Sequence, residues 1–181
     1  MRPRFGPIMP NVRRQGDTIH NINGLEVIAQ IALGLAGFSG VMIAFARPSG
    51  ALTPPVHFRL RALSYASFGA MFLAIIPFAV FNGPWPESTS WRLLGVVVTA
   101  YTAAGLLYFP IAAFRLRREY PHLFQLPLAV VLVVIDVCRF LLALAVLFGS
   151  KYHANAYIMV LILLLLQGSI TFIRGLFQMR D

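Results

Sequence analysis

The sequence predicts an all-α protein, a multi-pass transmembrane helical bundle of about five membrane-spanning helices. Hydrophobic residues make up 59% and charged residues 12% of the chain of 181 residues, whereas soluble domains are about half apolar and a quarter charged. The mean hydropathy is +0.76. Apolar runs of about 20 residues, the length that crosses a bilayer as a helix, recur along the chain and leave little room for a soluble domain.

The apolar runs divide the chain into a bundle, residues 25–177, between two tails. The polar basic N-terminal tail, residues 1–24, carries three prolines near its start, which argues against a packed element there. The C-terminal tail, 178–181, is short. Within the bundle we expect five spans, at residues 25–46, 60–81, 93–114, 126–148 and 156–173.

The first predicted span has two alternative interpretations, a cleaved signal peptide and a segment that enters the membrane without crossing it. Ala44 and Ala46 fit the A-x-A cleavage site of a secretory signal peptide, although the preceding polar region is much longer than such signals use. A first segment that entered the membrane without crossing it would leave four true spans. Five spans place the N-terminus outside, with eight basic residues in the cytoplasm against six outside.

The fourth predicted span holds an acid and a base at its middle, Asp136 and Arg139. Each costs roughly 2.5–3.5 kcal/mol at the centre of an inserted helix, and each Leu, Ile, Val or Phe returns roughly 0.3–0.6 kcal/mol. The run has sixteen such apolar residues, so the two sums are similar and insertion is feasible. Because the charges are three residues apart, they share one helical face and can pair, and this face should point into the bundle.

Small residues recur every four positions in the first two spans. Such ladders let helix backbones approach closely, so we expect these spans to form a tightly packed hairpin, although alanine is also simply common in membrane helices. The packing candidates are Ala32, Ala36, Gly40 and Ala44 in the first span and Ala62, Ala66, Ala70 and Ala74 in the second.

A four-residue repeat flanks the second and third spans. Phe58-Arg59-Leu60-Arg61 begins the second span and Phe114-Arg115-Leu116-Arg117 ends the third, so both should lie on the same side of the membrane. Arginine matches phosphate oxygens with two parallel hydrogen bonds, which makes Arg59, Arg61, Arg115 and Arg117 candidates for a phosphate or anionic lipid headgroup. The alternative is the ordinary enrichment of basic residues beside membrane spans.

Catalytic and metal-binding patterns are sparse. Gly37-Phe38-Ser39-Gly40 matches the G-x-S-G of rhomboid-type intramembrane serine proteases, but no predicted span carries a histidine that could serve as the base. Close helix packing explains these small residues equally well. No two histidines have the spacing of metal ligands, Cys138 is the single cysteine, and the acids Glu26, Glu87 and Asp136 lie far apart in sequence. We therefore expect no metal site and no cofactor, and an enzymatic role is disfavoured.

Two functions follow from the buried charges. In the first, the protein is a small channel or transporter in which Asp136 carries a proton or cation and other polar side chains line the path. In the second, the charges are structural and the protein is an interaction, assembly or accessory module. The candidates for the polar path are Asp136, Arg139, Gln167, Glu26, Thr99 and Thr102.

The net charge of +9 does not indicate a nucleic-acid partner, because the basic residues lie mostly at the ends of apolar runs. The expected partners are the bilayer, its anionic headgroups, and further copies of the chain or other membrane proteins. Every basic residue except Lys151 is arginine, a usage typical of GC-rich bacterial genomes, so we expect a bacterial inner membrane.

Overall fold

The computed structural model describes residues 12–46, 54–120, 126–149 and 152–178. These residues form five α-helices and no strand, as the sequence predicts, and each helix is long and apolar enough to cross a membrane. The all-helical fold class is therefore confirmed. The helices are α1 (Val12–Ala46), α2 (Pro54–Phe81), α3 (Glu87–Glu119), α4 (Leu126–Leu147) and α5 (His153–Gln178).

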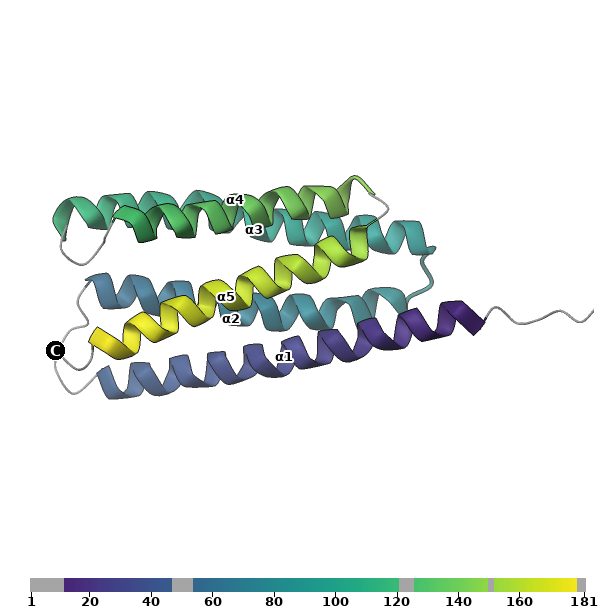
Figure 1. Cartoon of the computed structure of the whole chain (residues 1–181), viewed down its shortest axis with the longest axis horizontal. Coiled ribbons are helices and arrows are strands. Elements are labelled where there is room, and N and C mark those ends of the chain that lie inside the picture. Colours follow the sequence, from purple (N-terminus) through teal and green to yellow (C-terminus); the bar gives the residue numbers. More distant parts are fainter. Residues whose placement is uncertain (1–11, 47–53, 121–125, 150–151, 179–181) are drawn as a thin grey trace, which may run out of the picture.

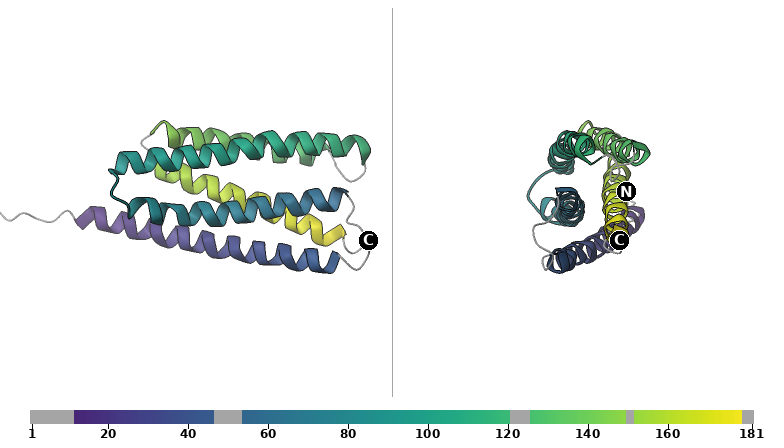
Figure 2. Two further views of the ribbon diagram at one scale, coloured as in Figure 1. Left: turned by 180° about the vertical axis from the view of Figure 1, so that it is seen from behind. Right: turned by 90° about the vertical axis from the view of Figure 1, so that its left-hand side faces the viewer.

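Consecutive helices run in opposite directions along the bundle, so α1, α3 and α5 end where α2 and α4 begin (Figure 1). Seen end-on, α3 and α4 lie side by side at one edge, α1 lies at the opposite edge, and α2 and α5 lie between them (Figure 2). The α5 helix runs diagonally, starting beside α4 and ending near α1 (Figure 1). We call the end of the bundle where α5 finishes the arginine end, because Arg59, Arg117 and Arg174 lie there.

The core lies along the contact lines of α2 and α5 with their neighbours. The largest cluster of buried apolar side chains draws on all five helices, with Ala32, Ala70, Leu94, Val146 and Leu161 as examples. Many large apolar side chains face outward instead, among them Leu107, Ile111 and Leu141. A lipid environment accommodates such side chains without the cost that water imposes.

The α1 helix extends into the predicted N-terminal tail. The α1 helix begins at Val12, so the second half of residues 1–24 is helical rather than irregular. The prolines of the tail all precede Val12, and after them no proline interrupts the helix. The apolar window of α1 is Gly24–Val41, which matches the start of the predicted first span.

The α1 and α2 helices pack side by side (Figure 1). In α2, Ala62, Ala66, Ala70 and Ala74 are all buried. The α2 helix touches α1, α3 and α5, so several of its faces are covered and every rung of the ladder finds a neighbour.

Only part of the small-residue ladder of α1 is buried against neighbouring helices. Ala32 and Ala36 are buried, but Gly40 is exposed and a side chain there would meet open space. The prediction for Gly40 is wrong because four residues turn a helix by about 400°, so a four-residue ladder rotates off a straight interface by about 40° per step. The side chain of Ala44 lies outside the described residues.

The closest approach of α3 and α4 occurs at Gly95. A Cβ atom at this position would lie 2.5 Å from the Leu147 Cα atom and 2.8 Å from its backbone nitrogen. Backbone atoms cannot rotate away as a side chain can, so the two helices would have to separate. The α3–α4 contact therefore requires glycine at position 95.

We predict that Gly95→Ala lowers the free energy of unfolding by about 1–3 kcal/mol through overpacking. Gly37→Ala is the matched control, because Gly37 is also helical and no atom lies within 4 Å of the added Cβ. The control should be neutral or gain up to about 1 kcal/mol from helix propensity. Thermal unfolding of the purified protein in detergent measures both variants, and equal stability would contradict the close contact.

Candidate functional site

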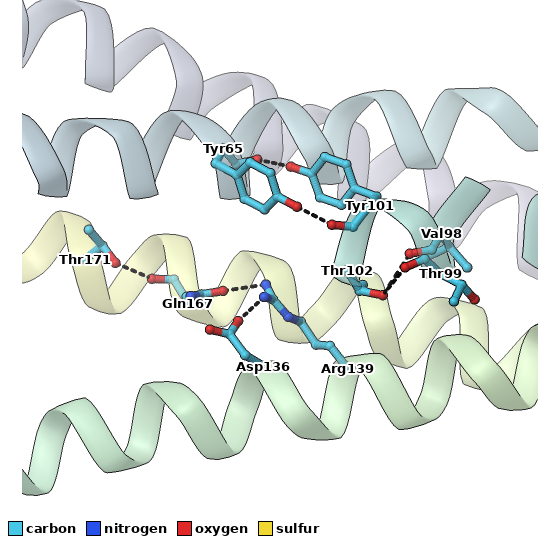
Figure 3. Close-up of polar contacts among 9 residues, drawn as sticks. All are labelled: Tyr65, Val98, Thr99, Tyr101, Thr102, Asp136, Arg139, Gln167 and Thr171. Carbon is cyan, nitrogen blue, oxygen red and sulfur yellow. Dashed lines mark hydrogen bonds and ion pairs between the residues drawn. The ribbon is translucent and has the colours of Figure 1, made fainter. Parts of the chain in front are cut away.

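The buried charges of α4 lie at the centre of the bundle and face α5. Asp136 is 2% exposed and Arg139 is fully buried. One terminal nitrogen of Arg139 donates to Asp136 Oδ1, and the other donates to Gln167 Oε1 on α5 (Figure 3). Asp136, Arg139 and Gln167 form what we call the charge cluster. The predicted i,i+3 ion pair is therefore present, and it extends to a second helix.

Nearly every buried polar atom described for the charge cluster has a hydrogen-bond partner. Gln167 is also buried, and the following turn of α5 is closed by Thr171, whose hydroxyl donates to the Gln167 backbone carbonyl at 2.8 Å. Among the buried polar atoms described for the cluster, only Arg139 Nε lacks a hydrogen-bond partner. A buried guanidinium is costly unless a counter-charge and acceptors surround it. This arrangement supplies both and joins α4 to α5.

A cavity of about 70 Å³ lies between α2, α3, α4 and α5 at the arginine end. Asp136 and Gln167 line its inner part. Three arginines also line it, namely Arg59 at the start of α2, Arg117 at the end of α3 and Arg174 near the end of α5. Apart from Thr171, the remaining walls are apolar, with Phe58, Ala113, Phe114, Leu132 and Ile170 among their residues.

The other candidates for a polar path lie elsewhere. Thr102 is buried but donates to two carbonyls of its own helix, Val98 O at 2.9 Å and Thr99 O at 3.1 Å, so its hydroxyl is engaged within α3. Thr99 and Thr102 lie farther along the bundle than Asp136 (Figure 3). Glu26 on α1 is exposed and accepts from Gln30 Nε2 at 3.4 Å. None of Glu26, Thr99 and Thr102 lines the cavity.

The two arginine repeats lie at the same end of the bundle but contribute unequally to the cavity. Arg59 and Arg117 line it, whereas Arg61 and Arg115 are exposed and do not. Arg61 donates to the Tyr108 hydroxyl at 2.7 Å instead. Two positions apart on a helix point in nearly opposite directions, which explains why each repeat supplies only one arginine.

Sequence reasoning missed two features of this region. One is Arg174, which approaches the cavity only because α5 runs diagonally. The other is a stacked pair, Tyr65 on α2 and Tyr101 on α3, with ring centroids 4.3 Å apart. Each tyrosine hydroxyl donates to the backbone carbonyl of the other tyrosine (Figure 3).

The tyrosine pair has a recognisable sequence signal. Gly69 and Gly105 each stand four residues after one of the tyrosines, and a side chain at either glycine would clash with the ring of the opposite tyrosine. The pattern Tyr-x-x-x-Gly therefore occurs once on each of two antiparallel helices. It fixes how α2 and α3 cross beside the charge cluster.

The serine of the G-x-S-G pattern is hydrogen-bonded within its own helix. The Ser39 hydroxyl donates to the Ala36 backbone carbonyl at 2.7 Å, a contact within α1. In the described ranges, no three side chains among His, Cys, Asp and Glu lie close enough to hold a metal ion.

Comparison with known proteins gives no relative: no family model, no curated protein and no solved structure matches the chain. The five apolar helices are compatible with an integral membrane protein. The charge cluster and the cavity are the features of the bundle that bear on a more specific role.

We predict that Asp136→Asn lowers the free energy of unfolding by about 3–5 kcal/mol, because the buried Arg139 charge loses its counter-charge. The double variant Asp136→Leu/Arg139→Met removes both charges at similar volume and should recover most of that loss. Unfolding in mixed detergent measures all three proteins. A double variant as unstable as Asp136→Asn would show that the ion pair is not what the single substitution disrupts.

Proposed function

We propose that this chain is a non-catalytic membrane interaction, assembly or accessory module in which the charge cluster is structural. The observation that carries the proposal is the engagement of both terminal nitrogens of Arg139, one with Asp136 on the same helix and one with Gln167 on α5. A carboxylate that carries protons or cations has to release its partners during each cycle. Here its partner is a buried guanidinium that is itself fastened to a second helix.

The location of the positive charges also favours the structural role. A cation that approached Asp136 through the cavity would pass Arg59, Arg117 and Arg174, and would then meet Arg139 beside the carboxylate. Like charges in a low-dielectric environment repel strongly. This arrangement disfavours a cation path from the arginine end.

A second candidate function is proton or small-ion transport through Asp136. It is favoured by one observation: Asp136 lines the cavity as well as pairing with Arg139, so a carboxylate at membrane depth borders an internal space. Intramembrane acids beside such spaces are the usual components of proton relays. Because an odd number of spans does not divide into two inverted repeats, alternating access is hard to build within one chain, and a pore would form more easily between copies of the chain.

Either function places the chain in a bilayer with other membrane proteins or further copies of itself as partners. We propose the bacterial inner membrane, on the strength of the nearly exclusive use of arginine among the basic residues. All five helices have outward-facing apolar side chains, which are available for such contacts.

Flux into liposomes that hold the purified protein separates the two functions. We predict that proton and alkali-cation flux across a range of pH stays at the level of protein-free liposomes, because the charge cluster is closed by its own partners. A pH-sensitive dye and an ion-sensitive dye inside the liposomes measure it.

The matched variants are Asp136→Asn and Glu26→Gln, which each remove one carboxylate, the first in the charge cluster and the second on the exposed face of α1. Wild-type flux above background that falls in Asp136→Asn while this variant stays folded, and that persists in Glu26→Gln, would overturn the structural role. It would establish Asp136 as part of a transport path.

A further inference from the structure

We propose that the cavity at the arginine end binds a membrane phospholipid with a net anionic headgroup. Arg59, Arg117 and Arg174 would hold the phosphate, and the apolar walls would receive the start of an acyl chain. The proposal goes beyond the structural role of the charge cluster, because it concerns a different part of the cavity and a ligand taken from the bilayer.

The first argument is charge. Three arginines from three different helices line one small cavity, and Arg59 lies close enough to Arg174 for their like charges to repel. The acid that lines the same cavity, Asp136, is already paired with Arg139. A phosphate bound between Arg59 and Arg174 would reduce this repulsion, and a phosphate group can accept two parallel hydrogen bonds from a guanidinium.

The second argument is position along the membrane normal. Arg59 lies near the start of the candidate span of α2, Arg117 lies near the end of that of α3, and Arg174 is the last residue of that of α5. All three therefore lie at one end of the spans, where lipid phosphates lie. Basic pockets between transmembrane helices at this depth are the usual form of a headgroup site.

The third argument is the chemistry of the walls. Between the arginines and the centre of the bundle, the cavity is lined by aromatic and aliphatic side chains from four helices, including Phe109, Ala113 and Leu132. The diagonal course of α5 separates its last turns from α4 at this end (Figure 1). A free phosphate ion would use only the arginines, whereas a phospholipid would use the arginines and the apolar walls together.

The two arginine repeats provide matched variants for the test. Arg59→Gln/Arg117→Gln removes one cavity arginine from each repeat, and Arg61→Gln/Arg115→Gln removes the exposed arginine of each repeat. Both pairs remove two positive charges from the same ends of the same two helices. A general attraction between a basic surface and anionic lipid would weaken equally in both.

The experiment measures lipid binding to the purified full chain in detergent by native mass spectrometry and by the shift in unfolding temperature. The probes are dioleoyl phosphatidylglycerol, dioleoyl phosphatidylcholine, dioleoylglycerol and inorganic phosphate. We expect phosphatidylglycerol to bind more tightly than the other three. Since a charge-assisted hydrogen bond contributes enough to change affinity by about tenfold, the cavity pair should weaken phosphatidylglycerol binding by about tenfold or more. The exposed pair should retain wild-type affinity.

Ala113→Leu adds bulk to the apolar wall and leaves every arginine in place, so it should also weaken phosphatidylglycerol binding. Equal weakening in both arginine pairs would overturn the site, and stabilisation by inorganic phosphate as great as by phosphatidylglycerol would assign the cavity to a free anion instead. If the cavity pair does not assemble, Ala113→Leu decides the question, because unchanged lipid binding in that variant would overturn the proposal.

Discussion

The burial of one guanidinium constrains the rest of this bundle. Arg139 is fully buried at mid-helix, and such a charge requires a counter-charge and acceptors that stay in place. Asp136 supplies the charge from the preceding turn, and Gln167 supplies an acceptor from α5. The α4 and α5 helices are thereby held at a fixed register, and the stacked Tyr65 and Tyr101 fix the crossing of α2 and α3.

The diagonal course of α5 links the charge cluster to the cavity. The helix contacts α4 at the cluster and then ends near α1, so α4 and the last turns of α5 diverge toward the arginine end (Figure 1). The cavity lies in this part of the bundle, and Arg59, Arg117 and Arg174 all line it. The diagonal course of α5 thus connects the charge cluster at mid-bundle with the three arginines at the edge of the spans.

The sequence predicts the parts of this structure that depend on composition and local spacing. Long apolar runs predict the five helices, and the three-residue spacing of Asp136 and Arg139 predicts their pairing. Local spacing does not reveal how a helix tilts against its neighbours. For that reason the sequence does not indicate that Arg174 reaches the cavity, and it groups Thr99 and Thr102 with Asp136 although neither threonine lines that cavity. Gly40 faces open space for a different reason, the rotation of a four-residue ladder around its helix.

The hydrogen bond between Arg139 and Gln167 joins the two helices that carry the charge cluster. A double-mutant cycle with Arg139→Met, Gln167→Leu and the combined variant measures that link through the free energy of unfolding. We expect a coupling of about 1–2 kcal/mol, the range of strong hydrogen bonds between membrane helices. Additive effects, with a coupling below about 0.3 kcal/mol, would contradict the account and show that α4 and α5 are held together by apolar packing alone.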